Sequence, residues 1–268
     1  WGDLSGKNHY ATPYQAESAR EPKYLAGGFN GKPSLQFDGA DDVLLAQNAN
    51  AFDSWDALTV FIIAQGNNTA NYRDFIGKSG EGSEGWLFGR QNNNSTRWMI
   101  RGTSGGDEHR FTFGVNSKRI WSLVYGDGIR KSFGNGAQKQ SSGDFGVIGS
   151  APLSSLAIGG RSKSNGNVGS FSKVLISEVL VYKTALSDDE RQKLEGHLAH
   201  KWDLTGNLNS SHPYKAVPPD FSDPSAGVDL TFYWGSVDGG TNPALWEHAV
   251  DLGNYYGQAN SPVAGISP

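Results

Sequence analysis

The sequence contains no cysteine among its 268 residues. This absence excludes thiolate zinc sites, iron–sulfur clusters and catalysis by a cysteine nucleophile, and it leaves no disulfide to stabilise the fold. A domain of this size can bury enough apolar surface to fold without one. The chain also has no apolar run that approaches the ~20 residues of a membrane-spanning helix, so we expect no insertion into a bilayer.

Positive charge is limited as well. The 23 Lys and Arg are outnumbered by 27 Asp and Glu, which gives a formal net charge of −4. Because the basic residues form no cluster in the sequence, we expect no nucleic-acid partner.

Glycine and aromatic residues are abundant instead: the chain has 36 Gly, 13 Phe, 10 Tyr and 8 Trp. Aromatic strands separated by glycine-rich turns are typical of antiparallel sandwiches and barrels. We therefore predict an all-β fold rather than an α/β fold.

The clearest pattern lies in segment 173–207. Its first part, Lys173–Tyr182, is apolar on both sides, which predicts a strand in the interior of a sheet. Ser187 and Glu190 have the spacing of a capping box, in which each side chain bonds the backbone amide of the other residue. These signals predict an amphipathic helix over 187–204, with an apolar face that recurs every four residues at Leu194, Leu198 and Trp202.

Strand signals recur along the rest of the chain. The most apolar run, Leu58–Gln65, predicts a core strand, and the polar, glycine-rich segment 102–109 predicts a loop. Turn signals at this spacing predict roughly ten to twelve strands in two packed sheets. The further strands are predicted at Pro33–Phe37, Val43–Ala46, Phe75–Lys78, Gly85–Arg90, Arg97–Arg101, Arg110–Val115, Arg119–Tyr125, Leu156–Gly159 and Val228–Trp234.

Prolines mark a boundary toward the C-terminus. Segment 208–219 has no periodicity and ends in Pro218-Pro219, so we predict a strap lying on a domain of residues 1–219. The 49 residues of 220–268 form a β segment that is too short for a comfortable core of its own. We expect this segment either to pack on the first domain or to receive its missing strands from elsewhere.

Several stretches resemble the concanavalin A-like laminin-G/jelly-roll domains of large bacterial modular surface proteins. The resemblance covers roughly residues 1–215 and implies an antiparallel jelly-roll β-sandwich with one C-terminal helix. The tail resembles the first half of a fibronectin type III-like module, on the residues Tyr233–Gly235, Val237–Thr241, Trp246 and Leu252-Gly253. The stretches that carry the first resemblance are Trp1–Asn8, Leu35–Gly39, Ile176–Tyr182, Ala185–Arg191, Leu198–Trp202 and Ser211–Tyr214.

This resemblance implies an extracellular or cell-surface location and a non-catalytic structural or adhesive role. The chain starts at Trp1 without an initiator methionine, and both ends fall inside the resembling domains. We therefore expect neighbouring domains of a longer chain, or further copies of this chain, as partners. In the filament version of this hypothesis, a strand from one subunit completes the sheet of the next.

Catalytic arrangements lack support. A jelly-roll glycosidase uses two carboxylates on one strand face, about 5–5.5 Å apart in a retaining enzyme, and strand neighbours at i, i+2 or i, i+4 usually provide such a pair. Glu178 is the lone acid on its face, and we place Asp107 and Glu108 in a loop. His197 and His200 have i, i+3 spacing instead of the i, i+4 of a zinc protease, so packing or surface roles are favoured. We therefore expect no enzyme, and a glycoside hydrolase or lyase is the least favoured of the functional alternatives.

Calcium is the metal that the resemblance implies, bound by loop carboxylates at the rim of the sandwich. Asp38, Asp41 and Asp42 gather in one turn, and Glu178 is the expected fourth ligand from a neighbouring strand. The alternative is that these aspartates only form the turn.

A glycan-binding surface is the second functional hypothesis, because exposed aromatic rings beside polar donors suit sugars. One predicted hairpin carries such residues. The alternative is that Trp86 and Phe88 form a core-facing aromatic pair. The candidate glycan contacts are Trp86, Arg90, Asn92, Trp98 and Arg101.

Overall fold

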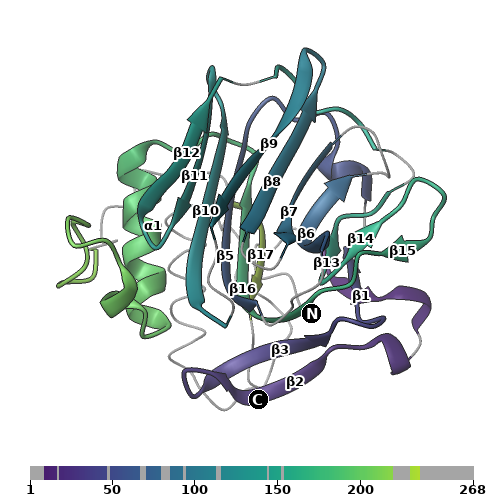
Figure 1. Ribbon diagram of the computed structural model, residues 1–268, viewed down its shortest axis with the longest axis horizontal. Coiled ribbons are helices and arrows are strands. Elements are labelled where there is room, and N and C mark those ends of the chain that lie inside the picture. The colour runs from purple at the N-terminus through teal and green to yellow at the C-terminus, as the bar shows by residue number, and fades with distance from the viewer. Residues whose placement is uncertain are drawn as a thin grey trace, which may run out of the picture.

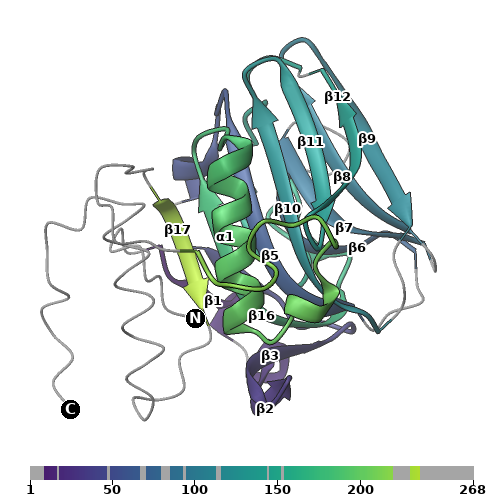
Figure 2. The ribbon, with the colours of Figure 1, turned by 90° about the vertical axis from the view of Figure 1, so that its left-hand side faces the viewer.

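The computed structural model describes residues 9–16, 18–46, 49–66, 71–79, 85–92, 95–112, 116–143, 145–151, 154–219 and 230–235. These residues form two large antiparallel sheets and one helix, α1 (Asp188–Lys201), which lies against one sheet on the side away from the other (Figures 1 and 2). The predicted all-β sandwich with one C-terminal helix is confirmed. No helix within the described ranges is both long enough and apolar enough to cross a membrane.

The seven-stranded sheet runs in the order β1 (Ala11–Pro13), β4 (Leu44–Ala46), β13 (Ala157–Ile158), β6 (Arg73–Ser79), β7 (Gly85–Asn92), β8 (Ser95–Gly102) and β9 (Gly105–Thr112). The eight-stranded sheet runs in the order β12 (Ala137–Ser142), β11 (Ile129–Gly134), β10 (Lys118–Gly126), β5 (Leu58–Gly66), β16 (Lys173–Tyr182), β3 (Lys32–Asp38) and β2 (Lys23–Phe29), with β17 (Leu230–Gly235) also beside β16. A small hairpin of β14 (Arg161–Ser162) and β15 (Val168–Gly169) and short 3-10 turns at Tyr14–Ala16, Ser18–Arg20, Ala49–Phe52 and Thr205–Asn207 complete the described elements.

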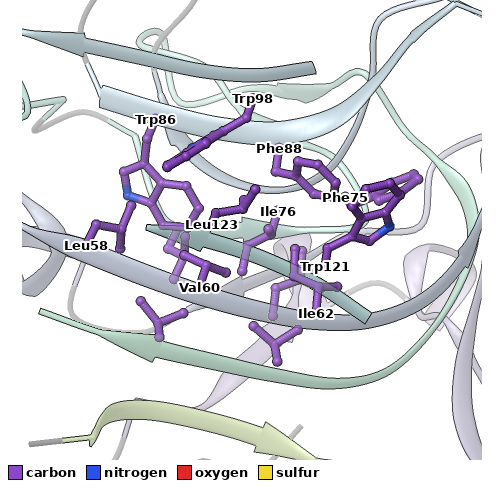
Figure 3. Packing of buried hydrophobic residues seen from close by; sticks show 14 of the residues in the cluster. Leu58, Val60, Ile62, Phe75, Ile76, Trp86, Phe88, Trp98, Trp121 and Leu123 are labelled. Atoms are coloured by element: carbon purple, nitrogen blue, oxygen red, sulfur yellow. The ribbon is translucent and has the colours of Figure 1, made fainter. Parts of the chain in front are cut away.

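The main core lies between the two sheets. Side chains of β7 and β8 point toward those of β5 and β10, as Figure 3 shows for Trp86 and Trp98 on one side and Val60, Ile62 and Trp121 on the other. All five side chains are fully buried. Tryptophan and branched aliphatic residues therefore fill the interior of the sandwich.

A second core lies between the eight-stranded sheet and α1. Strand β5 contributes Phe61 and Ile63 to it, while its alternate residues face the first core. Because both faces of β5 and β16 are covered, these strands are continuous apolar runs. The predicted helix face of Leu194, Leu198 and Trp202 packs here.

The capping box begins α1 as predicted. The Glu190 amide donates to the Ser187 Oγ at 3.3 Å, and the Ser187 amide donates to the Glu190 carboxylate at 2.7 Å. The helix itself is shorter than the predicted 187–204, since it ends at Lys201, and the C-cap Trp202 donates its amide to the Leu198 carbonyl.

Segment 102–109 was predicted as a loop, and this prediction is wrong. Strand β9 begins at Gly105 after a turn at Thr103-Ser104, so Asp107 and Glu108 lie on a strand. Gly105 adopts a φ of 129°, which only glycine reaches without strain, and this allows the tight hairpin.

The C-terminal region contributes one described strand. In register, β17 pairs with the second half of β16, from Glu178 to Tyr182, while β3 pairs with the first half, from Lys173 to Ile176. This is the arrangement expected if the tail packs on the first domain. The boundary near Pro219 stays a prediction, and the segments Trp1–Asn8, Val237–Thr241 and Trp246–Leu252 lie outside the described residues.

Candidate functional site

The two tryptophans predicted to contact a glycan belong to the core. Trp86 and Trp98 are both fully buried between the sheets, where Trp98 meets His109 edge to face. The pleat of β7 and β8 places both rings on the inner side of the seven-stranded sheet. Neither ring presents a face to a ligand, so for these residues the core-packing interpretation holds.

The other three predicted glycan contacts differ in exposure. Arg90 is fully buried and donates from Nη2 to the Asn92 carbonyl at 2.8 Å. Asn92 and Arg101 are exposed. Of the predicted set, these two side chains remain accessible to a ligand.

The outward side of the seven-stranded sheet carries an arginine–carboxylate network that the sequence did not reveal. Arg97 and Asp74 lie on β8 and β6, and the residue of β7 between them in register is Gly89. Because Gly89 has no side chain, Arg97 extends across β7 and places Nη2 2.9 Å from the Asp74 Oδ1. Arg161 on β14 donates to the other oxygen of Asp74 at 2.7 Å.

One exposed aromatic ring lies on this network. The Arg97 guanidinium carbon is 5.0 Å from the centre of the Tyr72 ring, and Tyr72 is 51% exposed. Arg97 itself is only 5% exposed. The Arg97 guanidinium therefore bonds the buried Asp74 and contacts the exposed Tyr72 ring. This cation–π contact fixes the Tyr72 ring at the surface.

The network continues onto β9. Glu108 accepts from Arg97 Nη1 at 3.4 Å and from Arg110 Nη2 at 2.8 Å. Arg101 follows Arg97 on the same side of β8 and faces Gly106 in register. We define the outward arginine face by Tyr72, Asp74, Arg97, Arg101, Glu108, Arg110 and Arg161.

The predicted calcium ligands gather in part. The carboxylate oxygens of Asp38, Asp41 and Asp42 lie within 4.8 Å of one another, and no other such acidic or histidine group occurs in the described part of the chain. Burial raises the pKa of Asp42 to about 6, and repulsion by Asp38 and Asp41 contributes. Three clustered carboxylates suit a hard divalent cation, so the aspartate triad can hold one.

Turn-forming bonds are also present in this triad. The Asp38 amide donates to Asp42 Oδ2 at 2.7 Å, and the Ala40 amide donates to Asp38 Oδ1 at 2.7 Å. These bonds use some of the oxygen lone pairs and fix the positions of the carboxylates.

Glu178 does not belong to this triad, and its prediction as a calcium ligand is wrong. Its carboxylate lies under α1, where it accepts from Lys201 Nζ at 2.8 Å and from the Trp202 indole. A bulge between Ile176 and Glu178 turns the acid toward the helix. Glu178 therefore anchors the last turn of α1 on the sheet.

The histidines make structural contacts. His200 bonds the Tyr214 carbonyl at 3.0 Å, and His212 in the strap bonds Glu195 at 3.2 Å. Glu195 is fully buried and also accepts from Ser122 and Arg191. This network joins the strap, the helix and the eight-stranded sheet.

His109 lies in a second buried network, between the sheets. It bonds Ser132 at 3.2 Å and Ser142 at 3.0 Å, and Arg130 donates to its Nε2 at 3.1 Å. Burial, together with the charge of Arg130, lowers the pKa of His109 to about 4. The imidazole is neutral and holds the edge strands of the two sheets together.

The spacing Gly-x-Ser-x-Gly occurs once on a described hairpin, at residues 102–106. In hydrolases the serine of this motif lies between a strand and a helix. Here Ser104 lies in the turn between β8 and β9, so the segment is not a nucleophile elbow.

Comparisons with known proteins identify the fold. No family model and no curated protein matches the sequence. The binding domain of Paraclostridial Mosquitocidal Protein 1 matches with a TM-score of 0.55 and 13% identity over 73% of this chain and 49% of that one. The binding domain of botulinum neurotoxin serotype D matches with a TM-score of 0.51 and 13% identity over 71% of this chain and 46% of that one.

A third solved structure is domain 4 of the arabinanase AbnA from Geobacillus stearothermophilus in complex with arabinotriose, with a TM-score of 0.48 and 13% identity over 68% of this chain and 85% of that one. The chain spans about half the length of the toxin binding domains that it matches. It therefore has the two-sheet antiparallel sandwich of these binding domains, a concanavalin A-like fold.

Proposed function

We propose that this chain is a non-catalytic carbohydrate-binding module of an extracellular protein, and that the outward arginine face binds the glycan. The observation that carries the proposal is Tyr72, an exposed ring held in place by Arg97. Sugar recognition needs an apolar platform for the ring carbons beside fixed polar groups for the hydroxyls. Tyr72 is the platform, and the charged neighbours are the polar groups.

The rigidity of this face favours the same function. Asp74 is fully buried and bonded to two arginines, so the polar groups around it are fixed before a ligand arrives. A preorganised site loses less side-chain entropy on binding. The resemblance of the fold to the binding domains of two toxins also supports a binding role.

A glycan array tests this proposal. We expect the chain to retain oligosaccharides and the variant Tyr72→Ala to lose about tenfold in affinity, because the platform is removed. Tyr24→Ala is the matched control, since Tyr24 is 45% exposed but lies on β2 of the other sheet. An array without hits, or equal losses in both variants, contradicts the proposal.

We also propose that the aspartate triad binds calcium. The pKa of Asp42 is raised chiefly by burial and also by repulsion from Asp38 and Asp41, and a bound cation offsets both effects by favouring the ionised carboxylate. Calcium then raises the midpoint of thermal unfolding of the wild-type chain. The variant Asp41→Asn loses most of that shift, and an equal shift in both proteins rules the site out.

The filament hypothesis is a second proposal for a structural role of the same module. The edge of β16 that a neighbouring strand would use carries β17 of the same chain, so a donated strand has to displace it. Sedimentation of the chain over a range of concentrations tests this proposal. Concentration-dependent polymers support it, and a monomer at all concentrations contradicts it.

A further inference from the structure

We infer that the glycan bound by the outward arginine face is an acidic oligosaccharide, with carboxylate or sulfate groups that repeat along its length. This inference rests on the proposed glycan-binding function and adds the class of the ligand. It starts from the charge of the face. Four arginines meet two carboxylates there, although the whole chain carries a net charge of −4.

The arginines of this face differ in how well they are neutralised. Arg97 and Arg161 both bond the buried carboxylate of Asp74. Arg97 also reaches Glu108, so its two terminal nitrogens are occupied. Its role is therefore to hold Tyr72 and the carboxylates in place.

Arg101 has no carboxylate partner among the residues that the structure describes. Its side chain is exposed, and its Cγ lies beside Gly106, where a Cβ would come within 2.7 Å of it. The missing side chain of Gly106 gives Arg101 a path along the surface of β9. An exposed guanidinium without a counter-ion among the described residues favours a carboxylate or sulfate, two of whose oxygens can accept parallel hydrogen bonds from it.

Arg110 is the second available cation. Its side chain is 60% exposed and its only described carboxylate is Glu108, which Arg97 also contacts. An exposed ion pair of this kind contributes little to stability, so Arg110 can turn toward a ligand at low cost.

The spacing of these two arginines favours a ligand that carries more than one anionic group. Arg110 lies opposite Arg97 in register, and Arg101 lies four positions further along β8. At ~3.3 Å per residue this separates Arg101 from Arg110 by about 13 Å along the sheet. A chain of acidic sugars can place a separate anionic group at each of these two arginines, while Tyr72 lies beside Arg97 in the row of Arg110.

Calorimetric titration with matched polymers tests the inference. Polygalacturonate carries carboxylates and its fully methyl-esterified form is neutral, while a sulfated galactan and its desulfated form provide the sulfate arm. We expect at least one acidic polymer to bind about tenfold or more tightly than its neutral form, and its affinity to fall as salt is raised. The polymer pair in which the acidic form binds more tightly shows whether the anionic group is a carboxylate or a sulfate.

Variants link this binding to the arginine face. Arg101→Glu reverses the charge of the arginine that has no described carboxylate partner and is expected to weaken acidic-polymer binding about tenfold or more. Lys131→Glu is the matched control, because it makes the same change of charge at a lysine that lies beside α1 and pairs with Asp188. Thermal unfolding of both variants confirms that the fold is intact.

Two outcomes separate this inference from the function on which it rests. If acidic and neutral polymers bind equally and Arg101→Glu has no effect, the acidic class is excluded while glycan binding by Tyr72 stands. If no polymer and no arrayed glycan binds, both proposals fail.

Discussion

Arg97 on β8 and Asp74 on β6 form a buried ion pair across a strand that lies between them, with 2.9 Å from Nη2 to Oδ1. The side chain of Asp74 is 1% exposed and that of Arg97 is 6% exposed. The pair is therefore shielded from water. Removal of either residue would leave the other as a buried charge without its partner.

Replacing Asp74 tests this dependence. Asp74→Asn leaves Arg97 and Arg161 without their shared negative charge, and we expect the free energy of unfolding to fall by about 3 kcal/mol. Urea denaturation measures this change. Arg110→Ala is the control, since it breaks an exposed pair with Glu108 and costs less than about 1 kcal/mol. Equal stability of Asp74→Asn and wild type contradicts the expected role.

Gly89 is the residue that allows this pair to form. A Cβ at Gly89 would lie 2.2 Å from the Arg73 carbonyl and 2.6 Å from the Asp74 Cα. Gly89→Ala therefore forces β6 and β7 apart, and we expect a loss of about 2–4 kcal/mol in thermal or urea unfolding. Gly143→Ala serves as comparison, because a Cβ there meets nothing within 4 Å. A loss no larger than that of the comparison variant contradicts the expected clash.

Asp42 predicts a pH dependence in the absence of calcium. Its pKa is raised from 3.8 to about 6, so the folded state binds the proton more tightly than the unfolded state. The stabilising effect of the proton is fully present below pH 3.8 and is lost as pH rises through 6. Asp42→Asn keeps a side-chain acceptor for the Asp38 amide and cannot ionise, so we expect it to be more stable than wild type at pH 7, by about 1–3 kcal/mol.

Unfolding midpoints of wild type and Asp42→Asn, measured from pH 4 to pH 8 in a chelator, check this prediction. The difference should shrink below pH 6. A constant difference across the range contradicts it.

His109 predicts a pH dependence of opposite sign. Burial, with Arg130 beside it, lowers the pKa of His109 from 6.5 to about 4, so the unfolded state binds the proton more tightly. The contribution of the neutral imidazole to the free energy of unfolding is complete above pH 6.5 and is lost as pH falls through 4. We expect wild type to lose about 3 kcal/mol over this window on account of His109.

The variant His109→Gln isolates this effect, since it retains polar contacts to Ser132 and Ser142 but does not titrate in the window. The free energy of unfolding of both proteins is measured against pH. Because carboxylates titrate in both proteins, the difference between the two free-energy curves reports the imidazole. Parallel curves from pH 7 to pH 4 refute the assignment.

Local sequence patterns predicted the fold class and its central elements. The apolar run of β5 and the strand–cap–helix segment that contains β16 and α1 were recognised because burial on two faces, helix periodicity and a capping box all act over short distances. Strands β2, β11 and β12 were missed, because β2 and β12 are largely exposed and β11 buries the polar residues Arg130 and Ser132. Their Asn-Gly turns, Asn30-Gly31 and Asn135-Gly136, both have positive φ and are the signal that identifies such hairpins.

The candidate site could not be read from the sequence in the same way. Trp98 alternates with Arg97 along β8, and the sequence did not show that the ring faces the core while the arginine faces outward. The pairing of Asp74 with Arg97 and Arg161 depends on strand register and on a hairpin 87 residues away. Long-range register of this kind is specified by the whole core, not by a local motif.

The position of β16 also has a consequence for how the chain folds. This strand is paired with β5, and Thr59 meets Tyr182, which lies 123 positions later in the sequence. Sheets built from such distant partners close a long loop before they gain contacts, so they fold slowly, on the millisecond-to-second scale. During synthesis, β5 can pair with β10 but remains without its other neighbour, β16, until Tyr182 has left the ribosome. The apolar run of β5 is therefore the segment of the nascent chain that most needs protection from aggregation.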